Sequence, residues 1–107
     1  MRARVTDDGG VELVGRLAVR GAAAAREALH EALRGEGRGD GRVLVDLSGV
    51  ELLDATGLGV LVGAHRQARL QGRELVLCDA RPRVARLLTL TRLDRVIAME
   101  RRRSVLA

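Results

Sequence analysis

Hydrophobic and polar residues alternate near the start of the chain, and this pattern predicts two strands. Residues 2–6 alternate weakly, and residues 11–17 alternate again with their apolar positions on one face. The segment 7–10 between them, Asp-Asp-Gly-Gly, is a strong turn signal. The chain is therefore expected to begin with a β-hairpin.

Three later segments change to a helical period. The first begins after Gly21 and is expected to end at Gly35, the second is expected to run over 57–71, and Pro82 stands where a proline at the first helical position belongs. The positions that share one side of each helix should face the core. They are Ala22, Ala25, Leu29, Ala32 and Leu33, then Val60, Leu61, Ala64 and Ala68, and finally Val84, Leu87 and Leu88.

Three short apolar runs predict the remaining strands, over 43–45, 75–78 and 95–99. Continuous rather than alternating apolar residues are typical of strands covered on both faces. Strands separated by helices imply right-handed parallel crossovers. With 107 residues there is room for one core. We predict a single α/β domain over 1–107, a mixed, mostly parallel sheet packed with helices in the order β-β-α-β-α-β-α-β, with a short basic tail over 101–107.

The net charge of +5 raises the question of a nucleic-acid partner. All 19 Lys-plus-Arg residues are arginine, and they are scattered, with the only run at 101–103. The chain has no aromatic residue that could stack on a base. We expect no specific nucleic-acid partner.

The apolar runs and the single cysteine indicate where in the cell the protein is expected. No run approaches the roughly 18 apolar residues that a membrane span needs, and the first ten residues contain no hydrophobic stretch typical of a signal peptide. Cys78 alone cannot form an internal disulfide. We expect a soluble cytoplasmic protein without membrane insertion.

Candidate catalytic groups are few. His30 and His65 are the only histidines, and Cys78 ends an apolar strand, where a buried, inert thiol is expected. Asp46 and Asp54 are eight residues apart and could share a cleft, but no other polar machinery accompanies them. No glycine-rich phosphate loop or cluster of metal ligands is visible. We expect no catalytic residue, no metal and no cofactor, and hence not an enzyme.

The segment 54–57, Asp-Ala-Thr-Gly, precedes the second helix. Asp54 or Thr56 at its start would satisfy a free backbone N–H group, which is worth about 1 kcal/mol. Leu58 and Val62 lie about a third of a turn from the core stripe, because each residue advances about 100°. They share that flank with basic residues, so this side of the helix is a candidate protein-docking strip.

The run over 43–97 resembles a STAS domain of the bacterial anti-sigma factor antagonist family. The resemblance rests on the strand followed by Asp-Leu-Ser at 46–48, the Asp-x-x-Gly-Leu-Gly motif at 54–59, GRELVLC at 72–78 and ARPRVARLLTLTRLDRVI at 80–97. It implies a mixed sheet with helices, as the periodicity also does.

The resemblance also implies a function. Members of that family bind an anti-sigma factor, typically a GHKL-type serine-protein kinase, and so release a sigma factor. The kinase phosphorylates the residue after the motif aspartate, usually serine. Here Ala55 holds that position and cannot be modified, and Thr56 is the possible substitute. Ala18 also departs from the family, which often has aspartate there, and the segment after the last strand is short.

We therefore expect an anti-sigma factor antagonist without the usual phosphorylation switch. The expected contact residues lie at the start of the second helix and along it: Asp54, Ala55, Thr56, Gly57, Leu58, Val62, Arg66 and Arg69. The alternative is a STAS subunit of a membrane lipid-transport ATPase assembly. Whether Ala55 is natural or a Ser-to-Ala replacement, and which oligomeric state the chain adopts, stay open.

Overall fold

The computed structural model describes residues 1–102, in which five strands form one sheet in the order β1-β2-β3-β4-β5. The strands are β1 (Arg2–Val5), β2 (Val11–Leu17), β3 (Arg42–Leu53), β4 (Glu74–Cys78) and β5 (Ala98–Glu100). Strand β1 runs antiparallel to β2, and the later pairs β2–β3, β3–β4 and β4–β5 are parallel. The predicted mixed α/β sheet is confirmed.

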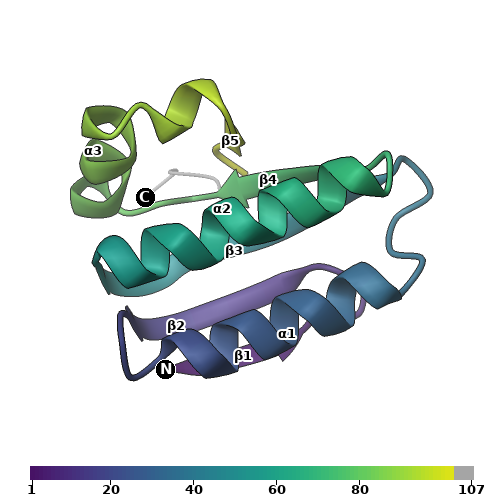
Figure 1. Ribbon diagram of the computed structural model, residues 1–107, viewed down its shortest axis with the longest axis horizontal. Helices are drawn as coiled ribbons and strands as arrows, with labels where there is room; N and C mark the ends of the chain where they lie inside the picture. Colours follow the sequence, from purple (N-terminus) through teal and green to yellow (C-terminus); the bar gives the residue numbers. More distant parts are fainter. Residues whose placement is uncertain (103–107) are drawn as a thin grey trace.

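Three helices and one 3-10 turn connect these strands. They are α1 (Ala22–Arg34), α2 (Ala55–Leu70), α3 (Pro82–Leu90) and the turn η1 (Leu93–Arg95). Helices α1 and α2 lie side by side across one face of the sheet, and α3 lies at the end of the sheet where α2 begins (Figure 1).

The core fills the space between the sheet and the two long helices. All five predicted core positions of α1 and all four of α2 are buried, as are Val84 and Leu88 of α3. Leu87 is only half-buried, although it packs against the core. No aromatic side chain contributes, so leucine, valine and alanine supply most of the buried apolar surface.

The sheet is not covered equally on its two faces. In β3, Val43 and Val45 are fully buried whereas Leu44 between them is half-buried. Two-sided burial of this segment was therefore a wrong prediction, because α1 and α2 cover only the face to which Val43 and Val45 point. Strand β4 fits the prediction, since all four residues over 75–78 are buried.

Two other boundaries differ from the predictions. Strand β3 is 12 residues long and includes Asp46, because it follows β2 through two register shifts instead of ending after Val45. The last strand, predicted over 95–99, is short and begins at Ala98. The N–H groups of Val96 and Ile97 both bond to the carbonyl of Leu93, which holds this segment in a turn.

The basic tail predicted over 101–107 falls largely outside the described residues. Arg101 and Arg102 follow β5 without joining it, and the backbone N–H of Arg102 donates to Asp79 Oδ1 at 2.7 Å. Residues 103–107 lie outside the part of the chain that the structure describes.

Candidate functional site

The start of α2 is built on a side-chain cap. Asp54 has an extended backbone conformation, and its Oδ1 accepts a hydrogen bond from the N–H of Gly57 at 2.9 Å. This bond satisfies one of the backbone donors that a helix leaves free at its N-terminus, which is worth about 1 kcal/mol. Of the two capping candidates in the sequence, the structure selects Asp54. The helix consequently begins at Ala55, two residues earlier than predicted.

Gly57 anchors this helix start against the end of β2. A β-carbon at position 57 would overlap the carbonyl oxygen of Leu17 and would lie 2.8 Å from Leu53 Cδ1. The N–H of Asp54 also reaches the carbonyl of Leu17, at 3.4 Å. The glycine of the motif is therefore required by close packing, and it holds the first turn of α2 at the end of the sheet.

Ala55 and Thr56 are the two motif residues that face outward, and both are exposed. Within residues 1–102 the Thr56 hydroxyl makes no hydrogen bond, because the capping role belongs to Asp54. The structure thus presents a methyl group and a free hydroxyl side by side at the exposed tip of α2.

The remaining predicted contact residues follow along α2. Leu58 and Val62 are half-buried, and Leu58 packs against the core cluster, so it is less available than the sequence indicated. Arg66 and Arg69 are exposed further along the helix. The eight predicted residues thus lie on one helix and its cap, although Gly57 is buried. Their role in contacting a partner remains a prediction.

Sequence reasoning missed two exposed apolar residues near the ends of β2 and β3. Val19, just after β2, and Leu52, near the end of β3, are 71% and 43% exposed. The alternation of β3 was the available signal for Leu52, because its neighbour Leu53 points into the core and adjacent residues of a strand point to opposite faces. Leu52 is thus an exposed apolar residue two positions before the motif.

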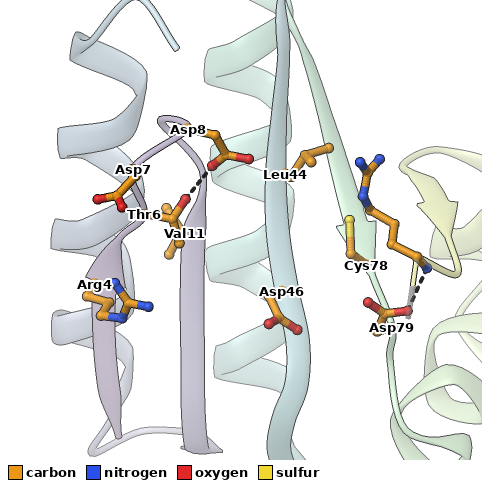
Figure 2. A pocket seen from close by; sticks show the side chains of 10 residues that line it. Arg4, Thr6, Asp7, Asp8, Val11, Leu44, Asp46, Cys78 and Asp79 are labelled. Atoms are coloured by element: carbon orange, nitrogen blue, oxygen red, sulfur yellow. Dashed lines mark hydrogen bonds between the residues drawn. The ribbon is translucent and has the colours of Figure 1, made fainter. Parts of the chain in front are cut away.

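A separate cavity of about 440 Å³ is lined by side chains from β1, β2, β3 and β4 and from the segments that follow them (Figure 2). Asp46 and Cys78, which are register partners on β3 and β4, line it together with Arg4, Asp8 and Leu44. Asp46 Oδ1 accepts from the N–H of Ser48 at 2.9 Å. Asp54 does not line this cavity, so the two aspartates considered together in the sequence do not share a cleft.

The chemistry of this cavity is that of an unactivated thiol. Burial raises the pKa of Cys78, and the carboxylates of Asp79 and Asp46 act in the same direction, although the Arg102 guanidinium opposes them. None of the described residues that line the cavity is a histidine. A protonated thiol without a neighbouring base is a poor nucleophile, and the predicted burial of Cys78 is confirmed.

A hydrogen-bonded turn closes one side of the same cavity. The Thr6 hydroxyl and the N–H of Gly10 both donate to Asp8 Oδ1, and these bonds lower the pKa of that carboxyl. Across residues 1–102, no group of three or more histidine, cysteine, aspartate or glutamate side chains is arranged to hold a metal ion. Among the same residues, no helix has both the length and the apolar character needed to cross a membrane.

Comparison with known sequences supports a family assignment. A family model described as the STAS domain matches residues 3–105. An anti-sigma F factor antagonist of Paenibacillus polymyxa is 31% identical over 55 residues, covering 51% of this chain and 47% of the relative. An anti-sigma-B factor antagonist of Listeria monocytogenes is 41% identical over 56 residues, covering 52% and 49%. The matched region spans about half the length of these curated relatives.

Solved structures share the fold. The anti-sigma factor antagonist SpoIIAA in its unphosphorylated form has a TM-score of 0.74 at 15% identity, over 96% of this chain and 88% of that one. An anti-sigma-factor antagonist (STAS) domain protein from Planctomyces limnophilus has a TM-score of 0.75 at 24% identity, over 94% and 91%. At these identities the likeness concerns the arrangement of the sheet and helices.

Proposed function

The chain belongs to the STAS domain family, and on that premise we propose that it is an anti-sigma factor antagonist. In this proposal it binds an anti-sigma factor of the GHKL serine-protein kinase type and so releases a sigma factor for transcription. Because sigma factors act on RNA polymerase, the proposal places the protein in the cytoplasm. Its role is that of a binding module, which recognises its partner through surface shape and charge and catalyses no reaction.

The observation that carries the proposal is the geometry of the first turn of α2. The Asp54 cap and the contact between Gly57 and Leu17 hold this turn in one position. Ala55 and Thr56 project from it into solvent. A surface held in this way loses little conformational entropy on binding, which favours recognition by a protein partner. Leu58 and Val62 on the flank supply apolar contact area, and Arg66 and Arg69 supply charge.

Ala55 decides how such an antagonist would be regulated. A kinase partner that aims the γ-phosphate of ATP at the residue after the motif aspartate finds a methyl group at Ala55. The Thr56 hydroxyl is turned by about 100° around the helix axis. We propose that the protein behaves as a permanently unphosphorylated antagonist. Its activity would then depend on its concentration and on that of the anti-sigma factor.

Reconstitution tests this function directly. Each anti-sigma factor encoded in the source genome is purified, and its binding to the full chain is measured by isothermal titration calorimetry. Transcription by RNA polymerase with the cognate sigma factor is then measured with the anti-sigma factor present. We expect the chain to bind one anti-sigma factor and to restore transcription. Binding to none of them, or binding without restored transcription, would refute the proposal.

Ala55 also favours the second candidate, a STAS subunit of a lipid-transport ATPase assembly, because such a subunit needs no phosphate acceptor. The same calorimetric titration is performed with the transporter ATPases encoded in that genome. Binding to an ATPase of this class, with no binding to any anti-sigma factor, would replace the first proposal by the second.

A further inference from the structure

An apolar groove lies between the end of β3 and helix α3, with a volume of about 260 Å³. Leu52, Leu87 and Leu90 line its open part, and the buried residues Leu53 and Val84 form its floor. Its volume is just below the range of roughly 300–1,000 Å³ that is typical of small-molecule sites. A groove of this size is suited to a few apolar side chains of a protein segment.

Two leucines of this groove are exposed, one on α3 and one on β3. In α3, Val84 and Leu88 point into the core, whereas Leu90 is 72% exposed. Leu52, at the end of β3, is 43% exposed on the other side of the groove. Grouped exposed apolar side chains are typical of interaction sites, whereas single ones need no explanation.

The charges around the groove indicate which segment fits it. Arg83 and Arg86 line the groove, and within residues 1–102 neither side chain forms an ion pair or hydrogen bond. Glu51 is the only acidic residue among the described residues that line it. The unpaired guanidinium groups make the rim positive, and a segment with carboxylates beside its apolar residues would complement both features.

The groove is also close to the proposed docking surface. Leu52 and Leu53 directly precede the capping residue Asp54 in the chain, and α3 lies at the same end of the sheet as the first turn of α2 (Figure 1). A partner that contacts the tip of α2 can therefore extend a segment toward α3.

We propose that this groove binds an acidic amphipathic helix of a protein partner, with leucine-like residues between Leu52 and Leu90 and carboxylates on Arg83 and Arg86. Helix-in-groove binding places apolar residues spaced at i, i+3, i+4 and i+7 on one face. The groove does not require the partner to be an anti-sigma factor, so this proposal can be tested independently of the function proposed above.

The test uses a synthetic alanine-rich peptide of about fifteen residues, the length at which isolated helices begin to be populated in water. It has leucine at the i, i+3, i+4 and i+7 positions, three glutamates beside them and alanine elsewhere, because like charges at i,i+4 spacing destabilise a helix, and a matched peptide has lysine in place of glutamate. Each is titrated into the isotope-labelled full chain, and methyl chemical shifts are recorded by NMR. We expect the acidic peptide to shift the methyl signals of Leu52, Leu87 and Leu90 and the lysine peptide to leave them unchanged.

Substitutions inside the groove, each with a control substitution elsewhere, test whether the peptide binds in the groove. Leu90→Ser should weaken acidic-peptide binding about tenfold, the loss expected when a leucine no longer becomes buried. Leu70→Ser should not, because Leu70 is 85% exposed on another helix. Arg83→Glu with Arg86→Glu should weaken binding, whereas Arg26→Glu with Arg34→Glu on α1 should not. Circular dichroism verifies that each variant is folded.

Three results would overturn the proposal. The first is the absence of shifts at the groove, and the second is equal binding of the acidic and lysine peptides. The third is self-association in sedimentation velocity that Leu90→Ser abolishes, which would identify a second copy of the chain as the occupant. The peptide titration contains no anti-sigma factor, so these results leave the function proposed above to its own reconstitution test.

Discussion

The carbonyl oxygen of Leu17, at the end of β2, fills the space where a β-carbon on Gly57 would lie. This contact joins two segments that are 40 residues apart in the chain and places the first turn of α2 at the end of the sheet. The φ angle of Gly57 is not among the positive values of this chain, so the requirement for glycine is one of space alone.

Replacing Gly57 by alanine should therefore destabilise the domain. The neighbour is a backbone carbonyl, which cannot turn aside as a side chain can, and overpacking of this kind costs about 1–3 kcal/mol. Gly59→Ala is the matched control, because a β-carbon at Gly59 meets no atom within 4 Å. That change should stabilise the helix by about 0.5–1 kcal/mol. Urea denaturation measures both, and equal effects of the two changes would contradict the packing argument.

Charged substitutions on the flank of α2 should distinguish residues that serve partner binding from residues that stabilise the fold. Val62 is half-buried and lies outside the core cluster, so Val62→Glu should leave the fold intact and weaken anti-sigma factor binding about tenfold, or 1.4 kcal/mol. Leu58 packs against that cluster, so Leu58→Arg should weaken binding and also lower the free energy of unfolding.

Calorimetry and urea denaturation of the same variants measure these two effects. Leu70→Glu, at the exposed C-terminal end of α2, is the control. It should leave binding unchanged and lower the free energy of unfolding by no more than about 0.3–1 kcal/mol, the cost of a negative charge at a helix C-terminus. Normal binding by Val62→Glu would remove this flank from the docking surface.

The absence of a hydroxyl group at position 55 should prevent phosphorylation of the protein. Incubated with ATP and the GHKL-type kinase proposed above as its partner, the unaltered chain should stay unmodified, and Ala55→Ser should gain one phosphate. Asp54 provides the cap, so the Thr56 hydroxyl is exposed and is the alternative acceptor in the motif. Intact-mass spectrometry followed by peptide mapping identifies the site. Phosphate on Thr56 of the unaltered chain would restore an ordinary switch, and the double change Ala55→Ser, Thr56→Val controls for misassignment.

The stability of the protein should fall at alkaline pH through Cys78. Burial raises the pKa of this thiol in the folded state, so above the ordinary cysteine pKa of about 8.5 the unfolded chain loses its proton first. The unfolded state then binds fewer protons, and the free energy of unfolding decreases as pH rises, by at most about 1.4 kcal/mol per pH unit for one group.

This titration is unusually easy to isolate, because the sequence contains no lysine and no tyrosine. Urea denaturation between about pH 8.5 and 10.5 should show the decrease in the unaltered chain, since arginine stays protonated throughout. Cys78→Ala should be less stable at neutral pH but should lose much of the slope. A slope unchanged by the substitution would mean that Cys78 is not its source.

The sequence alone determined that three helices occur and most of their buried positions, and it limited the cap of α2 to two candidates, Asp54 and Thr56. Helical periodicity is a local property, and all nine positions that it predicted to be buried in α1 and α2 are buried, although it left out Ala28. The choice of Asp54 as a capping candidate also needed only local chemistry, because the cap bonds to a residue three positions ahead. The resemblance carried by the motif at 54–59 is confirmed by the family match.

Tertiary structure decided the features that depend on segments distant in the chain. Strand β3 continues through Asp46 because β2 pairs along its length, and Leu44 stays half-buried because no described helix covers that face as α1 and α2 cover the other. The need for glycine at position 57 arises from Leu17, and the groove at Leu52 arises from α3. In each case the local pattern is compatible with several outcomes, and the space left by a distant segment selects one of them.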